Sequence, residues 1–509
     1  MSKQKGSGSD FVTDTAPAKS QIEVIEASIQ DLQKGLTDGK VTSEDLVKFY
    51  LARIDKYDQQ GPKLNSIITI NPKAQEEAKA LDQERKSKGP RGPLHGVPIV
   101  LKDNFDTYDM PTSGGNIAMA KSQPSKDAFL TKKLRDAGAI IIAKANLHEL
   151  ARSGTTMSSI TGQTLNAYDL TRTPGGSSGG TATAVAANFA VAGMGSDTVN
   201  SVRSPASAES LVGFRPTYGL LSRSGIIPAA MTQDMAGQIT RSVADAAIML
   251  NVLAGVDPTD SITEAAKGHI ETDYTTSLKK DGLKGKRLGV VKAIIGKDPE
   301  VIKVFDKALE DLKAQGAEIV YIEDPNFDTG KISKECDVQV YESNPNLDDY
   351  LKTLGPKAPV HNSEELIATG TLDKSIQKLL NSSQALMPNN LTDPNYKKAL
   401  DNGAALRTLV TKTFNDNKLD AFVYPHQQVL VAKISDEGQP GRNGILASIA
   451  QTPAITVPGG FSTPNSDAAL GVPVGIEFMG LQWSETKLIE IAYAYERATE
   501  HRQPPKVTP

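Results

Sequence analysis

Two polar loops of this 509-residue chain carry serines beside glycines, a combination that could perform acyl transfer. The first loop is Pro174-Gly-Gly-Ser-Ser-Gly-Gly-Thr181, and the second is Gly195-Ser-Asp-Thr-Val-Asn-Ser-Val-Arg-Ser204. Serine hydroxyls act as nucleophiles when a base lies beside them, and glycines let bare backbone N–H groups approach a reacting oxygen. The two loops therefore predict an acyl-transfer site with an oxyanion hole.

Three alternatives for the first loop fit less well. A flexible linker is not followed directly by an apolar segment, which here covers 182–193 and predicts a buried helix. A phosphate-binding loop needs a lysine after its glycines, and none follows. Residues 175–179 match the G-x-S-x-G elbow of α/β-hydrolases, but that elbow follows a hydrophobic strand, and residues 168–174 have no strand pattern.

A serine nucleophile needs a base, and no histidine lies near the loops in sequence. A lysine can serve when burial and neighbouring cations lower its pKa. Lys102 is a candidate because it ends the apolar run 97–101, although a lysine at a strand end is ordinarily a solvated terminus. Two S-x-x-K matches, at 277–280 and 484–487, lie in charged, surface-like stretches and show how common that pattern is.

The composition is that of a globular protein, with 39% hydrophobic and 23% charged residues. A net charge of −4 and 5% aromatic residues give no sign of a nucleic acid or an anionic membrane as partner. The single cysteine, Cys336, excludes an intramolecular disulfide and any CxxC metal cluster. Since the six histidines form no H-E-x-x-H motif either, we expect no metal and no cofactor.

No apolar run reaches membrane-spanning length, and no signal peptide is visible at the N-terminus. A cytoplasmic location is therefore the default expectation, although the sequence of an exported protein whose signal peptide had been removed would look the same. Residues 1–20 are small and polar, and we expect them to be disordered.

Beyond that tail, short apolar strands alternate with helices, which is typical of a sheet covered on both faces. We expect one large α/β domain over 21–509, in which 323–410 is a less readable, cap-like insertion. The expected strands are 96–102, 139–144, 286–291, 317–321, 420–425, 454–458 and 473–479. The expected helices are 21–34, 42–54, 72–86, 182–193, 242–254, 299–315 and 485–499.

Five motifs resemble, in order and spacing, those of the amidase signature family. They are Gly96-Val-Pro-Ile-Val-Leu-Lys-Asp-Asn104, Ala143-Lys-Ala-Asn-Leu-His-Glu149, Pro174-Gly-Gly-Ser-Ser-Gly-Gly180, Ser196-Asp-Thr-Val-Asn-Ser-Val-Arg-Ser-Pro-Ala206 and Gly213-Phe-Arg-Pro-Thr-Tyr-Gly219. The C-terminal runs 471–480 and 483–490 look most like the bacterial peptide-amidase branch. The resemblance implies an α/β/α fold, with a large mixed central sheet covered by helices on both faces.

The resemblance also implies a Ser–Ser–Lys triad. Lys102 matches the family's lysine, Ser177 its bridging serine after a cis peptide bond, and Ser201 its nucleophile. Neutral Lys102 would accept a proton through Ser177 as Ser201 attacks a carbonyl. Backbone N–H groups of the nucleophile loop would hold the oxyanion. The remaining residues expected to form the oxyanion hole or to bind substrate are Thr198, Val199, Asn200 and Ser178.

One departure from the family pattern is Val199-Asn200, where the family usually has two glycines. A β-branched valine does not tolerate positive φ. Either the loop does not need positive φ at 199, or the oxyanion hole is distorted.

Other polar residues of the motifs are expected to have structural roles. Ser178, Asp197 and Arg203 would support the nucleophile loop, while Lys144, Asn146 and Glu149 would pack and cap. His148 and His426 would be hydrogen-bonded histidines rather than catalysts.

These observations predict a cofactor-free serine hydrolase that cleaves a C–N amide bond. The leading substrate is a primary amide, such as a C-terminal peptide amide, and no nucleic-acid or membrane partner is expected. Two alternatives stay open. One is the catalytic subunit of a glutamine-dependent tRNA amidotransferase, and the other is a non-catalytic binding protein on the same fold.

Overall fold

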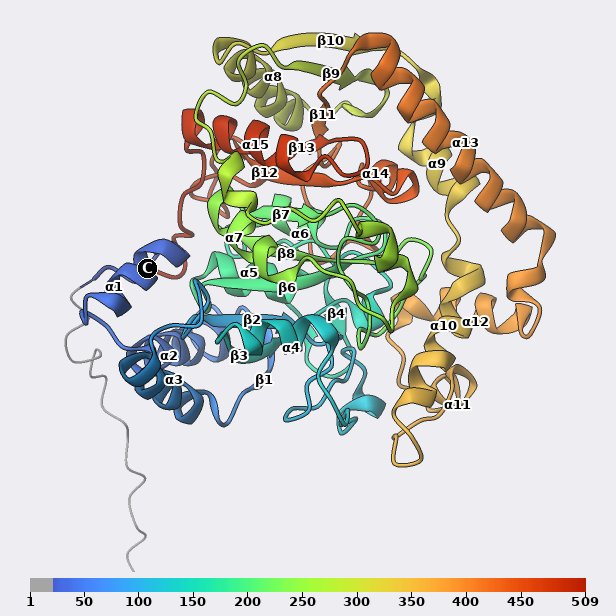
Figure 1. The fold of residues 1–509 in the computed structure, drawn as a ribbon. Coiled ribbons are helices and arrows are strands. Elements are labelled where there is room, and N and C mark those ends of the chain that lie inside the picture. Colours follow the sequence, from blue (N-terminus) through green and yellow to red (C-terminus); the bar gives the residue numbers. More distant parts are fainter. Residues whose placement is uncertain (1–21) are drawn as a thin grey trace, which may run out of the picture.

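The computed structural model describes residues 22–509, so the tail expected to be disordered lies outside the described residues (Figure 1). An 11-stranded sheet runs through the molecule. Its strands are β1 (Ile67–Ile70), β2 (Pro98–Lys102), β3 (Ile140–Ala145), β6 (Ala192–Asp197), β7 (Val212–Arg215), β8 (Met235–Thr240), β9 (Arg287–Val291), β10 (Glu318–Ile322), β11 (Ala421–Pro425), β12 (Ala454–Phe461) and β13 (Pro473–Met479).

The sheet is mixed, as expected. The spatial order is β1-β3-β2-β6-β8-β7-β12-β13-β11-β9-β10. Strands β3, β2 and β6 are mutually parallel, as are β11, β9 and β10, while the strands between these groups are antiparallel. Because parallel neighbours end at the same edge of a sheet, Lys102 at the end of β2 lies beside the end of β6, where the second serine loop begins.

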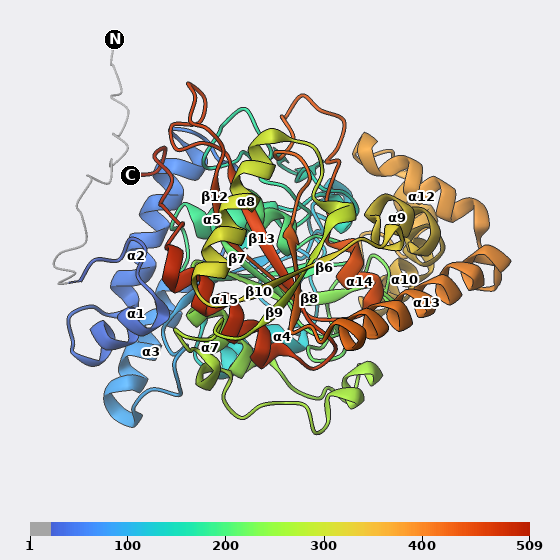
Figure 2. The same ribbon diagram turned by 90° about the horizontal axis from the view of Figure 1, so that it is seen from above.

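Helices cover both faces of this sheet (Figures 1 and 2). Helices α5 and α6 pack on each other and on the central strands, and α4, α7, α15 and α8 form a second, mutually contacting series. The helices of these two groups are α4 (Phe129–Asp136), α5 (Gly179–Ala186), α6 (Arg203–Ala208), α7 (Val243–Leu253), α8 (Pro299–Ala314) and α15 (Glu485–Thr499). The expectation of an α/β fold with helices on both faces is confirmed.

Capping residues stand at the starts of several expected helices. Thr42 and Asp45 form a reciprocal capping box at the start of α2 (Ser43–Arg53), and Ser242 caps α7. Helix α3 (Ala74–Lys88) matches its expected range closely. Helix α1 (Ile29–Thr37) begins later than expected, because Ser28 and Asp31 form its capping box.

The apolar run 182–193, expected to be one buried helix, is not one. Helix α5 ends at Ala186, Asn188 adopts a left-handed φ of 58°, and the chain continues as strand β6. Asparagine tolerates this conformation, which ends the helix. The prediction failed because every residue here is buried and nearly all are small, so neither a helical nor a strand period is visible.

The segment 323–410, expected to be a cap-like insertion, is helical. It forms α9 (Thr329–Cys336), α10 (Gln339–Thr353), α11 (Ser363–Ala368), α12 (Lys374–Leu386) and the first part of α13 (Pro394–Asn417). These helices lie along the right-hand side of Figure 1, beside the edge where β2 and β6 end. The starts of α9 and of α10 line the cavity beside Ser201 that is described below.

Within residues 22–509, no helix has both the length and the apolar character needed to cross a membrane. The same residues include no group of three or more His, Cys, Asp or Glu side chains arranged to hold a metal ion.

Candidate active site

Lys102 is fully buried at the carboxyl end of β2, among serine hydroxyls rather than carboxylates. Its Nζ lies 2.7 Å from Ser177 Oγ and 2.8 Å from Ser196 Oγ. Desolvation lowers the pKa of Lys102 to about 7, against the smaller opposing effects of Asp197 and Asp234. The side chain is therefore substantially neutral near pH 7 and has a lone pair available for a proton.

The glycine loop places Ser177 beside Lys102 by close backbone approach. A Cβ on Gly180 would lie 2.2 Å from the carbonyl oxygen of Asn146, so only glycine fits there. The Gly176–Ser177 peptide bond is cis, as the family resemblance implied. Ser178 is buried behind the second loop, where its N–H donates to Ser201 O (3.1 Å) and its hydroxyl donates to Ser196 O (3.2 Å). Ser178 therefore joins the two serine loops.

Ser201 lies on the wall of a cavity of about 490 Å³, together with Thr198, Val199 and Asn200. Among the described residues, the backbone N–H groups of Val199, Asn200 and Ser201 have no hydrogen-bond acceptor. No hydrogen bond within residues 22–509 joins the hydroxyls of Ser177 and Ser201. The loop thus presents a hydroxyl and unpaired N–H groups to one cavity.

Val199 and Asn200 keep negative φ, since neither is among the described residues with positive φ. Hydrogen bonds from neighbouring segments hold the conformation of this loop. Val199 O accepts hydrogen bonds from Arg203 (2.9 Å) and Ser448 (2.9 Å), and Asn200 Oδ1 accepts one from Gly444 N (2.8 Å). The loop therefore adopts no positive φ at 199.

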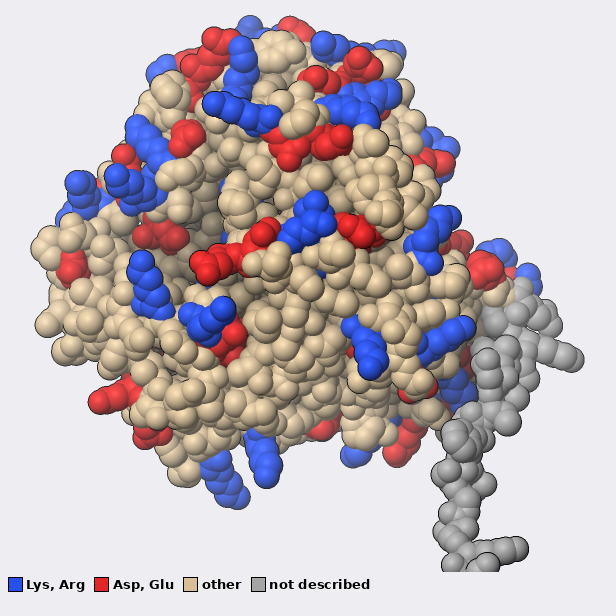
Figure 3. All heavy atoms as spheres, turned by 180° about the vertical axis from the view of Figure 1, so that it is seen from behind, with Lys and Arg blue, Asp and Glu red and all other residues tan. Residues whose placement is uncertain are grey.

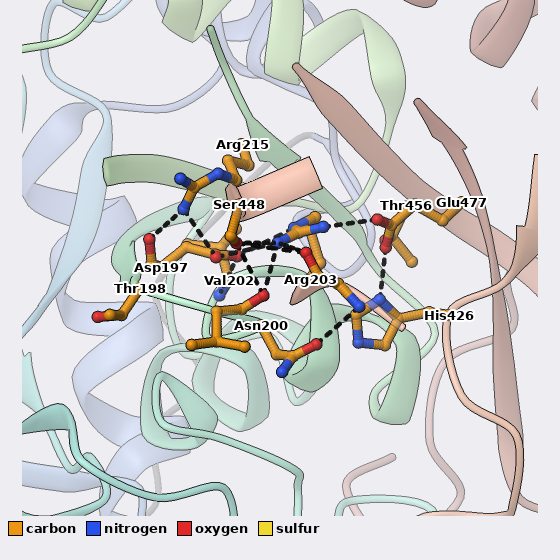
Figure 4. A network of polar contacts seen from close by, with 12 residues as sticks. Asp197, Thr198, Asn200, Val202, Arg203, Arg215, His426, Ser448, Thr456 and Glu477 are labelled. Carbon is orange, nitrogen blue, oxygen red and sulfur yellow. Dashed lines mark hydrogen bonds and ion pairs between the residues drawn. The ribbon is translucent and has the colours of Figure 1, made fainter. Parts of the chain in front are cut away.

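A buried charged network contacts this loop (Figure 4). Arg203 pairs with Asp197 at 3.0 Å and with Glu477 at 2.6 Å, and Arg215 pairs with Asp197 at 3.0 Å. The two arginines hold the pKa of Asp197 below its usual range despite burial, and Arg203 and His426 lower the pKa of Glu477 to about 2. Asp197 also accepts a hydrogen bond from Val202 N at 3.1 Å, so the network fixes the residue after Ser201.

The other motif residues have structural contacts. Lys144 Nζ lies 3.0 Å from Asp103 Oδ1, and Asn146 donates to Thr164 Oγ1 at 2.9 Å. Glu149 accepts hydrogen bonds from the side chain of Asn116 (2.8 Å) and from the backbone N–H groups of Ser159 (2.8 Å) and Asp373 (3.0 Å).

The two histidines singled out from the sequence are both buried. His148 bonds Ser375 Oγ at 2.7 Å, and burial lowers its pKa to about 4. His426 contacts Glu477 through Nδ1. The backbone N–H of His148 donates to Ser177 O at 2.9 Å, but neither imidazole has a described hydrogen bond to Lys102, Ser177 or Ser201.

Three residues of the site were not singled out from the sequence. Ser196 contacts Lys102 directly, and its place beside Asp197 in a motif could have suggested it. Arg152 and Arg442 line the cavity, but their sequence neighbours carry no motif. Only the fold brings Arg442 to Gly176, which is 266 positions away.

The fold and the serine–lysine cluster define an enzyme class, and comparison with known proteins agrees. The family model named Amidase matches residues 45–489, and the chain belongs to this family, the amidase signature family.

Three similar proteins cover almost the whole chain. The crystal structure of native peptide amidase from Stenotrophomonas maltophilia has 38% identity and a TM-score of 0.86, covering 95% of this chain and 99% of that one. A probable amidase of Arabidopsis thaliana is 35% identical over 507 residues, 96% of this chain and 93% of the relative. The A-type subunit of the glutamyl-tRNA(Gln) amidotransferase of Alkaliphilus metalliredigens is 35% identical over 492 residues, 94% of this chain and 97% of the relative.

Proposed function

We propose that this protein is a serine hydrolase that cleaves the C–N bond of primary amides through Ser201, Ser177 and Lys102. One observation carries the proposal. A fully buried lysine with a pKa lowered to about 7 lies 2.7 Å from a serine hydroxyl, beside a loop that presents a second serine to a cavity. A neutral lysine in hydrogen-bond contact with a serine can act as a base in acyl transfer.

In the first step, Ser201 Oγ attacks the amide carbonyl and gives its proton to Ser177, whose own proton passes to Lys102 Nζ. The Ser177 hydroxyl must turn towards Ser201 for this transfer. Such contacts are often long in the absence of substrate and shorten in the substrate complex. The unpaired N–H groups of Val199, Asn200 and Ser201 are the donors for the resulting oxyanion.

In the second step, the proton returns from Lys102 through Ser177 to the leaving nitrogen, and the C–N bond breaks. Ammonia leaves, and Ser201 stays acylated. Water then attacks the ester with the same base, which yields a carboxylic acid and restores Ser201. The likeness to peptide amidase supports a C-terminal peptide amide as one substrate of this kind.

Covalent labelling tests the assignment of the nucleophile. We expect a fluorophosphonate to modify the wild-type protein at a single serine, found by mass spectrometry in the peptide that contains Ser201. A Ser201→Ala variant should show no adduct. An adduct on Ser177 or Ser178 would contradict the assignment and favour the G-x-S-x-G interpretation.

The expected oxyanion donors give a second test. Replacement of Val199 and Asn200 by glycine removes the hydrogen bond that Gly444 N donates to Asn200 Oδ1 and loosens the loop. We therefore expect kcat on a small amide to stay similar or fall. A rise of about tenfold or more would mean that these side chains distort the donors, since one lost donor typically changes the rate by about 10²–10³-fold.

A second candidate function is that of the A-type component of a tRNA-dependent amidotransferase, because one such protein is as similar in sequence as the Arabidopsis amidase. Figure 3 shows basic and acidic side chains interspersed over the face it displays, which gives this candidate no support there. Hydrolysis of amides by the isolated chain, with no partner protein, would favour the hydrolase. Activity that appears only with partner proteins would favour the amidotransferase.

A further inference from the structure

Arg442 lies beside the reacting groups. It precedes α14 (Ile445–Ala450), is partly buried, and lines the same cavity as Ser201. Its Nη1 donates to the carbonyl oxygen of Gly176 at 3.2 Å, directly before Ser177. A Cβ on Gly154 would lie 2.5 Å from Nη1, so glycine at 154 provides the space that the guanidinium occupies.

The charge of Arg442 has no counter-ion among the described residues. The bond to Gly176 is the one hydrogen bond that its guanidinium makes within residues 22–509, although a guanidinium has five N–H donors. Arg203, by contrast, pairs with Asp197 and Glu477. Desolvation lowers the pKa of Arg442 only to about 10, so the side chain stays cationic at neutral pH.

Arg152, the second arginine that lines the cavity, already has protein acceptors for its N–H groups. Arg152 donates to Leu150 O (2.6 Å) and Pro228 O (3.2 Å), and to Ser343 through Oγ (2.7 Å) and the backbone carbonyl (3.0 Å). It therefore fixes neighbouring segments to one another. Arg152 thus makes four hydrogen bonds to the protein, as a structural arginine does, whereas the Arg442 guanidinium makes one within residues 22–509.

Two carboxylates also line the cavity, and both are engaged elsewhere. Asp337 accepts from Gln339 N (3.1 Å) and Gln339 Nε2 (2.8 Å). Asp328 is exposed and accepts from Lys331 N at 2.8 Å, at the start of α9. Neither forms an ion pair with Arg442, so an anion entering the cavity meets a guanidinium that has no ion-pair partner among the described residues, next to the serine cluster.

We propose that Arg442 binds a carboxylate on the acyl part of the substrate, so that the site prefers amides of acids that carry a second, ionised carboxylate. This inference rests on the proposed amide hydrolysis. The planar fork of a guanidinium matches a carboxylate in a bidentate manner. Because Gly176 is adjacent to Ser177, the second carboxylate lies near the scissile amide, which favours short acyl groups.

Matched substrates test the proposal. Succinamic acid and succinamide have the same shape, and only the first carries a carboxylate. We expect wild-type kcat/KM to be higher for succinamic acid, and Arg442→Gln to lower it by about 10- to 100-fold on this substrate with little change on succinamide. Arg442→Lys should retain part of the preference, because it keeps the charge and loses the fork.

Lys433→Gln is the matched control, since it removes the same charge from the same loop outside the cavity lining. It should leave the ratio of the two kcat/KM values unchanged. An equal loss on both substrates in Arg442→Gln would overturn the proposal and assign Arg442 to support of the Gly176 carbonyl. Unchanged kcat/KM values on both substrates in Arg442→Gln would overturn the proposal as well.

Calorimetric binding of succinate separates this inference from the proposed function, because it needs no turnover. We expect Arg442→Gln to weaken succinate binding by about tenfold or more, and Lys433→Gln to leave it unchanged. If that holds while neither amide is hydrolysed, the anion site stands and the proposed hydrolysis fails. If both amides are hydrolysed while succinate binding is the same in wild type and Arg442→Gln, the anion site fails and the hydrolysis stands.

Discussion

Two lysines are fully buried at the ends of neighbouring parallel strands, and they differ in what faces them. Lys144 on β3 pairs with Asp103 at 3.0 Å and donates to Thr112 Oγ1 at 3.0 Å. Lys102 on β2 has only hydroxyl and carbonyl oxygens of serines within hydrogen-bond distance. In the register of the sheet, Leu101 pairs with Lys144 and Lys102 with Ala145, so the two environments are adjacent.

The difference shows how one sheet edge produces a structural cation and a candidate base. Burial disfavours the charged form of any lysine. An ion pair offsets that cost, whereas neutral hydroxyls offset little of it, so the pKa of Lys102 falls to about 7. We infer that Lys144 acts on stability and Lys102 on reactivity.

The largest expected effect is that of Lys102→Met on catalysis. The variant lacks the proposed base, so kcat should fall by at least about 10³-fold. The melting temperature should stay within a few degrees of the wild type, since the change removes a desolvated amine that has no ion-pair partner. Steady-state kinetics and thermal unfolding by circular dichroism measure both. Retained activity, or a collapse of stability, would break the comparison.

Lys144→Met is the matched variant. It leaves Asp103 buried without its cation, so the free energy of unfolding should drop by about 3–5 kcal/mol. Below the melting transition, its kcat should stay far closer to the wild type than that of Lys102→Met. Equal stability in the two variants would show that the ion pair of Lys144 does not distinguish the two sites.

The second prediction concerns pH. Protonated Lys102 cannot accept a proton, so kcat/KM should fall about tenfold per pH unit below a midpoint near 7 and level off above it. The sign follows from the base being active when neutral. His148 stays neutral over this range, because its pKa is lowered to about 4. A flat profile between pH 5 and 9 would rule out a base with this pKa.

Asp106 supplies the control for that profile, because burial raises its pKa to about 7 as well. It accepts a hydrogen bond from Tyr350 at 2.7 Å and has no described contact with the serine cluster. An Asp106→Asn variant should keep the wild-type midpoint. A midpoint that moves in this variant would assign the titration to Asp106.

The smallest expected effect is that of Ser196→Ala. Ser196 Oγ accepts from Lys102 Nζ and from Asn104 Nδ2, each at 2.8 Å. Loss of an acceptor disfavours the ammonium form, so the midpoint of the kcat/KM profile should move to lower pH by less than about one unit. The plateau should fall by about tenfold or less. A move to higher pH would show that Ser196 does not stabilise the charged lysine.

Local features of the sequence determined much of the fold and the candidate residues. Capping at Thr42 and Ser242 depends on contacts within one helical turn, and most of the sheet was visible as apolar runs. The motifs named Lys102, Ser177 and Ser201, and the structure places Lys102 against Ser177 and Ser201 on the cavity wall. The fold predictions agree with the structure where the physical cause lies within a few residues, and the roles of the three site residues stay predictions.

Only the tertiary structure determines which groups each buried charged side chain contacts. Lys102 and Lys144 both end apolar strands, and nothing in either strand shows which of them gains a carboxylate. The contact of Arg442 with Gly176, the support of Val199 by Ser448 and the division of 182–193 into helix and strand are likewise set by packing between distant segments. The pKa of a buried group depends on its desolvation and on its nearest charges, and both are properties of the assembled fold.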